Sequence, residues 1–178
     1  MNRVETEIAL NRDRAWLLET FTAMDEDLLL QPVTESEYER GFWWTPKDHF
    51  AHLIRGERSF CLIVSAFADG HPNPLKAVAP KLGAGGESPI DYVNRGNDEF
   101  TKAHRDVSLA ELIRLGEEAR SETFALLARL TDDQFRMQIP GAPWSGGMVG
   151  PVLAHNSGDH ARMHWTWIEQ GWRDLADA

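Results

Sequence analysis

The sequence predicts an all-α protein, an antiparallel four-helix bundle with an extra short helix and a long interhelix loop rich in proline and glycine. Three observations indicate this fold. Apolar residues recur at helical spacing over several long segments, helix-start signals precede those segments, and no stretch combines strand-like alternation with β-branched residues. Amphipathic helices joined by loops bury their apolar faces against one another, which is the architecture of a bundle.

The first two helices are predicted in the amino-terminal third of the chain. The first runs from about Val4 to Met24, a segment rich in good helix formers, and turn-prone residues follow it toward Pro32. The second begins at the motif TPKD, residues 45–48, where threonine caps, proline fits the first turn and an acid lies three residues past the cap. This helix is expected to end at about Ala68, just before the sequence Gly-His-Pro.

The remaining helices follow a long crossing. Residues 70–88 are too rich in glycine and proline for regular structure. The motif SPID repeats the start signal and predicts a shorter helix over residues 88–104, and a capping pair Ser-x-x-Glu opens a long helix over 108–130. The last helix is expected over residues 148–172. Neither side of the crossing could bury a core alone, so residues 1–178 are predicted to form a single domain.

Composition limits the classes of partner. The chain has 178 residues and a formal net charge of −10, which argues against nucleic acid or an anionic membrane as a partner. No segment approaches the roughly 20 apolar residues of a membrane span, and the amino terminus lacks the apolar run of a secretory signal. The single cysteine, Cys61, cannot form an internal disulfide and is expected in the core. We therefore predict a cytoplasmic protein.

Two of the seven histidines suggest a metal centre. At about 100° per residue, His160 and His164 lie one turn apart in the middle of the apolar stripe of the last helix. His155 lies on the polar side, roughly 140° from His160. Buried imidazoles need partners, and two rings at this spacing can converge on one zinc, nickel or iron ion. Hydrogen-bonded core histidines are the alternative.

A third ligand is available on the second helix, where the pattern leaves two candidates open. His49 lies within the apolar sector, whereas His52 lies at its edge, roughly 60° away. Periodicity slightly favours His49, although a residue at the edge can still reach a neighbouring helix. Glu57 also points toward the core side of this helix. One interpretation of Glu57 is the carboxylate of a salt bridge. The other is a hydrogen-bond acceptor behind a metal ligand, or a base beside a metal-bound water.

Several aromatic and basic residues are candidates to line a substrate pocket, and each also has a purely structural interpretation. Trp44 precedes the second helix and Trp144 precedes the last one, so both are candidates to bind an organic substrate at one end of the bundle; otherwise they cap the core there. The other tryptophans considered are expected in the core or in a subunit interface: Trp16, Trp165, Trp167 and Trp172. Three arginines are either solvated or attract a carboxylated ligand: Arg55, Arg58 and Arg162.

Two motifs resemble a known family. The string WTPKDHFAHL, residues 44–53, resembles the tryptophan-led second helix of DinB-like proteins, and HARMH, residues 160–164, resembles the HxxxH motif of their last helix. The segment from Tyr92 and Asn97 through residues 108–130 is similar to the third-helix region of the mycothiol-dependent maleylpyruvate isomerase branch. The likeness covers roughly residues 1–172.

The resemblance implies a ligand set and a chemistry. It assigns His52, His160 and His164 as metal ligands, against the slight preference of the periodicity for His49. It implies an enzyme in which a divalent metal (Zn, Ni or Fe) holds a low-molecular-weight thiol, such as mycothiol or bacillithiol, for transfer to an electrophile or for isomerisation. Relatives continue HxxxH with Arg-Gly-Gln, whereas this chain continues Trp-Thr-Trp, so the particular thiol and substrate stay open.

Two other functions remain as alternatives. One is a metal-dependent hydrolase with Glu57 as base. The other is a non-catalytic, stress-associated bundle that binds a metal or a small molecule. A homodimer is compatible with each of these functions.

Overall fold

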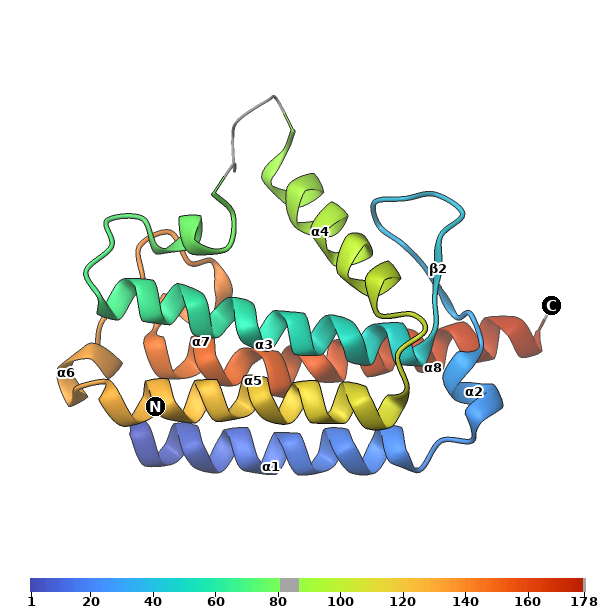
Figure 1. Cartoon of the computed structure of the whole chain (residues 1–178), viewed down its shortest axis with the longest axis horizontal. Helices are drawn as coiled ribbons and strands as arrows, with labels where there is room; N and C mark the ends of the chain where they lie inside the picture. Colours follow the sequence, from blue (N-terminus) through green and yellow to red (C-terminus); the bar gives the residue numbers. More distant parts are fainter. Residues whose placement is uncertain (81–86, 178) are drawn as a thin grey trace.

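The long helices of the computed structural model, which describes residues 1–80 and 87–177, lie side by side as a bundle (Figure 1). This confirms the predicted all-α fold. The bundle has four long helical segments: α1 (Arg3–Thr22), α3 (Pro46–Ala68), α5 (Leu109–Arg129), and α7 (Val149–His155) continued by α8 (Ala161–Ala176). Two segments run in one direction and two in the other, because the long connection that carries α4 (Pro89–Ala103) brings the chain back before α5 begins (Figure 1). No helix in the described ranges has the length and apolar character needed to cross a membrane.

The predicted capping signals start the helices where expected. At α3 the Thr45 hydroxyl accepts from the amide of Asp48, and the Asp48 carboxylate accepts from the amide of Thr45. The hydroxyls of Ser88 and Ser108 accept from amides three residues on and begin α4 and α5. Each cap satisfies a helix amide that has no partner within the helix, which explains why local sequence fixes these boundaries.

Short elements between the long helices were not predicted. The structure contains α2 (Glu26–Leu30) and α6 (Asp132–Phe135), and a two-residue strand pair where the sequence predicted no strands: β1 (Thr34–Glu35) with β2 (Trp43–Trp44). The strands are antiparallel, with Thr34 opposite Trp44. Strands of two residues are too short to produce an alternating pattern, so periodicity could not reveal them.

The glycine- and proline-rich crossing differs from its prediction in one respect. A 3₁₀ turn over Pro74–Ala77 lies within the segment expected to lack regular structure. Proline at the first position of this turn supplies the fixed backbone angle that helical turns require. The part of the crossing over residues 81–86 lies outside the described residues.

The last helix is interrupted, which contradicts the prediction of one continuous helix over 148–172. A π-helical turn, Asn156–His160, separates α7 from α8, and Gly158 leaves helical geometry there (φ −90°, ψ −107°). The extra residue in this turn rotates the side chains before it relative to those after it. His155 therefore does not face solvent as predicted: it is half-buried, and its ring stacks on His160 with 5.8 Å between centroids.

Buried apolar side chains form two clusters inside the bundle. Cys61 belongs to the first, as predicted. The second cluster contains Phe21 and Phe50, with ring centroids 5.0 Å apart. Three of the tryptophans expected in the core or an interface pack against this second cluster: Trp16, Trp165 and Trp172.

Candidate metal centre

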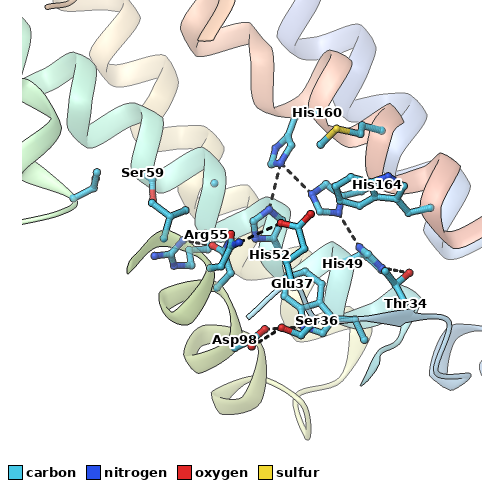
Figure 2. Close-up of a pocket in the computed structure, with 18 of the residues that line it drawn as sticks. Thr34, Ser36, Glu37, His49, His52, Arg55, Ser59, Asp98, His160 and His164 are labelled. Carbon is cyan, nitrogen blue, oxygen red and sulfur yellow. Dashed lines mark hydrogen bonds between the residues drawn. The ribbon is translucent and has the colours of Figure 1, made fainter. Parts of the chain in front are cut away.

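Three histidines from two segments of the bundle converge on one point (Figure 2). His52 comes from α3, His160 ends the π-helical turn, and His164 lies one turn later in α8. Each offers one nitrogen atom, and these atoms all lie within 4.8 Å of one another. The Nε2 atom of His160 is 3.4 Å from Nε2 of His52 and 3.0 Å from Nε2 of His164.

The environment of this trio fits a divalent cation. Burial is the largest cause that lowers the pKa of His160 to about 4, and it holds the pKa values of His52 and His164 well below their ordinary value. The rings are therefore neutral at pH 7, the state in which imidazole binds metals. Zinc–nitrogen bonds of about 2.0–2.1 Å at a tetrahedral angle separate two ligand nitrogens by about 3.3 Å. The separations of 3.0 and 3.4 Å match that spacing.

His49 does not belong to the trio; it contacts the ring of His164 from outside the trio. Its Nδ1 atom is 2.8 Å from Nδ1 of His164, and its Nε2 atom is 3.2 Å from the Thr34 hydroxyl. Burial lowers the pKa of His49 to about 3. Both nitrogens of His49 are thus occupied by neighbours, and the structure brings His52, rather than His49, toward His160. A hydrogen-bonded outer partner of this kind orients a histidine that binds metal.

The trio lines a cavity of about 260 Å³ whose walls are largely apolar and include several aromatic rings. Both tryptophans proposed from the sequence contribute. Trp44 donates from its indole nitrogen to Asp98 at 3.0 Å, and Trp144 packs edge-on against Phe60 with 5.0 Å between centroids. Trp167 also lines this cavity, with 4.7 Å between its ring centroid and that of His164. The prediction that Trp167 lies in the core or in a subunit interface is therefore corrected.

The polar lining of the cavity includes one of the three arginines considered above. Arg55, one turn after His52 on α3, donates to the side-chain oxygen of Asn97. The other two arginines are engaged elsewhere: Arg58 with Glu118 at 3.7 Å and Arg162 with Asp13 at 3.0 Å. Carboxylates of the strand pair, its connection and α4 also belong to the polar lining: Glu35, Glu37 and Asp98.

A sequence model of the DinB superfamily matches residues 9–168. The chain belongs to the DinB superfamily. A solved structure of an uncharacterised protein from Escherichia coli UTI89 is similar over 98% of this chain and 95% of that chain, with 14% identity and a TM-score of 0.64. At that identity the likeness shows the fold alone. No curated protein matches the sequence.

Glu57 is not brought to the centre of this DinB-superfamily bundle. Its carboxylate forms a buried ion pair with Arg120 of α5, with 2.6 Å between Oε1 and Nε, and both side chains are less than a tenth exposed. Among the described residues that line the cavity, Glu57 does not occur. Of its two predicted roles, the structure shows the salt bridge.

Three polar residues of the centre were not predicted as site residues from the sequence. Thr34 belongs to the strand pair, Asn97 to α4, and Asn156 to the π-helical turn. Asn156 accepts from Nδ1 of His160 at 3.1 Å and donates to the Leu53 carbonyl at 2.7 Å. Its spacing of four residues before His160 is the available signal, and the apolar stripe of the last helix does not reveal it because asparagine is polar.

Proposed function

We propose that this DinB-superfamily protein is a divalent-metal-dependent enzyme that presents a low-molecular-weight thiol to an electrophile, for transfer or for isomerisation. His52, His160 and His164 hold the ion. One observation supports this most: three neutral ring nitrogens converge on the wall of a largely apolar cavity. A divalent ion bound there supplies the positive charge that favours the thiolate form of a thiol.

The residues around the ligands bind and orient the reactants. The apolar walls formed by Trp44, Trp144 and Trp167 bind an organic body and exclude water from it. Arg55, held by Asn97 at the same cavity, orients an acidic group of the thiol or of the electrophile. Together, the apolar walls and Arg55 fix the positions of the two reactants relative to each other.

The hydrolase alternative is less well supported in the form predicted from the sequence, in which Glu57 is the base beside a metal-bound water. Glu57, the carboxylate considered for that role, is paired with Arg120 and does not line the described cavity. The proposed ion is zinc, nickel or iron, and the proposed thiol is a low-molecular-weight thiol such as mycothiol or bacillithiol. A homodimer and a cytoplasmic location stay predictions from the sequence.

Elemental analysis of untagged protein, purified without chelator, tests the metal centre. The wild type should hold close to one equivalent of metal, and the His160→Ala/His164→Ala variant should hold none. The matched control is His71→Ala, which removes an exposed histidine outside the cavity. No metal in the wild type, even after reconstitution, would overturn the proposed centre.

A coupled assay then tests the reaction. The loaded protein is mixed with 1-chloro-2,4-dinitrobenzene, with each thiol in turn and without thiol, and the release of chloride is followed. Turnover should require both metal and thiol. Turnover that needs metal but no thiol would support the hydrolase, and no turnover with any thiol would support a binding role.

A further inference from the structure

Both ends of the Asn156 side chain are engaged in the protein interior. This residue is 3% exposed and begins the π-helical turn. Its Nδ2 atom donates to the carbonyl oxygen of Leu53 in α3 at 2.7 Å, and its Oδ1 atom lies 3.1 Å from Nδ1 of His160. The amide thus connects the backbone of α3 to the ring of His160.

The chemistry of these groups fixes the direction of both hydrogen bonds. A carbonyl oxygen only accepts, so the amide nitrogen of Asn156 must face Leu53 and the amide oxygen must face His160. That oxygen also only accepts, so Nδ1 of His160 carries the ring proton. In a neutral imidazole the lone pair then lies on Nε2. This is the atom that faces Nε2 of His52 and of His164.

The other two rings of the trio are not constrained in this way. His164 meets His49, and His49 meets the Thr34 hydroxyl; each of these groups can either donate or accept. For His52, Nδ1 is buried and has no hydrogen-bond partner within the described part of the chain. Of the three rings, His160 is therefore the one whose tautomer is set by a neighbouring atom that can only accept a hydrogen bond.

Gly56 provides the space in which the Asn156 amide lies. A Cβ atom at this position of α3 would lie 2.2 Å from Oδ1 of Asn156 and 3.1 Å from its Cγ. Glycine in the middle of a helix weakens that helix, so its presence here calls for a packing reason. The amide is held at both ends, and it cannot move away from an added methyl group without losing one of its two hydrogen bonds.

We propose that Asn156 is a positioning residue: lodged against Gly56, it holds His160 in the Nδ1–H tautomer and directs Nε2 toward the other two histidines. The purpose of this arrangement rests on the proposed metal function, whereas the tautomer itself is a property of the metal-free protein. The π-helical turn brings Asn156 and His160 to the same face of α3, and π-turns of this kind often occur at functional sites.

Histidine tautomers in the metal-free protein test the proposal directly. Long-range ¹H–¹⁵N spectra of ¹⁵N-histidine-labelled protein at pH 7.5 should show His160 as the Nδ1–H form. Asn156→Leu, similar in size but unable to accept, should lose that preference. Asn156→Asp retains an acceptor oxygen and should restore it. Zinc affinity, measured by competition with a chromogenic chelator, should fall about 10–100-fold in Asn156→Leu.

A glycine pair separates this effect from general destabilisation. Gly56→Ala should reproduce the loss of the Nδ1–H form and of zinc affinity. Gly116→Ala is the control: this buried glycine of α5 does not line the cavity, and its Cβ would meet only the side chain of Arg14, at 2.7 Å, 2.9 Å and 3.2 Å. This control should keep the His160 tautomer and the zinc affinity of the wild type.

The outcomes distinguish this inference from the proposed function. A folded Asn156→Leu variant that keeps the Nδ1–H form, or that binds zinc as tightly as the wild type, would overturn the positioning role and leave the metal centre standing. A wild type that binds none of zinc, nickel and iron would overturn the metal centre, and the tautomer comparison would still decide the role of Asn156. If Asn156→Leu does not fold, the comparison of Gly56→Ala with Gly116→Ala decides it.

Discussion

The buried histidines should make the metal-free protein lose stability steeply in mild acid. His49, His52, His160 and His164 all have pKa values below the ordinary histidine value, with burial as the largest cause; the pKa of His49 falls to about 3 and that of His160 to about 4. In the folded protein these four rings stay neutral at pH 5.5. In the unfolded chain a histidine takes up a proton below a pKa of about 6.5. The unfolded state then binds more protons, so the free energy of unfolding falls as the pH falls.

The expected loss is large compared with the stability of an ordinary domain. Between pH 6.5 and pH 5.5, each histidine that is neutral when folded and titrates freely when unfolded lowers the free energy of unfolding by about 1 kcal/mol. Four such groups give a loss of about 4 kcal/mol, against a typical total of about 5–15 kcal/mol. Most carboxylates remain ionised in both states over this interval, so histidines dominate the change.

Urea unfolding of chelator-treated protein at the two pH values measures this loss, with tryptophan fluorescence as the probe. His49→Gln should remove about 1 kcal/mol of the pH dependence, because it removes one of the four groups. His71→Gln is the control: its ring is exposed, and the variant should keep the pH dependence of the wild type. A total fall of less than about 1 kcal/mol would refute the reasoning that the four rings are held neutral.

Single substitutions should separate the ligands from their neighbours. His52→Ala should abolish stoichiometric metal binding, whereas His49→Ala should keep the stoichiometry and weaken the affinity about 10–100-fold, as chelator competition would show; the reverse pattern would exchange their roles. Glu57→Leu should destabilise the protein by about 3–5 kcal/mol because Arg120 is left buried and unpaired, and Glu57→Leu/Arg120→Leu should recover much of that loss in thermal unfolding. Metal lost in Glu57→Leu would return this carboxylate to the centre.

The predictable parts of the fold are those that local chemistry determines. The starts of α3, α4 and α5 follow from Thr45, Ser88 and Ser108, whose side chains satisfy helix amides only three residues away. The pairing of β1 with β2 instead depends on contacts between residues ten apart in the chain, such as Thr34 and Trp44. Each strand has two residues, so no pattern within either one predicts the pair, and the place of Thr34 beside His49 could not be anticipated.

The helical periodicity is correct for the two histidines at the end of the π-helical turn and after it, and wrong for the histidine just before it. His160 and His164 lie at its end and after it, and a constant rotation per residue relates them correctly to the apolar stripe. His155 lies before the turn, where the extra residue has changed the phase, and its predicted outward position is wrong. An error of this kind arises wherever a helix is assumed to be regular, because one inserted residue rotates every side chain that precedes it by roughly 100° relative to those that follow.

The choice between His49 and His52 shows what periodicity measures. Periodicity favoured His49, and His49 is indeed the more buried of the two, 1% exposed against 6% for His52. Burial did not decide which ring joins the trio, because both nitrogens of His49 are directed at His164 and Thr34, whereas Nε2 of His52 faces His160. A helical wheel gives the depth of a side chain; the direction of a ring nitrogen depends on the neighbours that its other nitrogen meets. The motif-based resemblance selected His52 because a motif retains the direction as well as the depth.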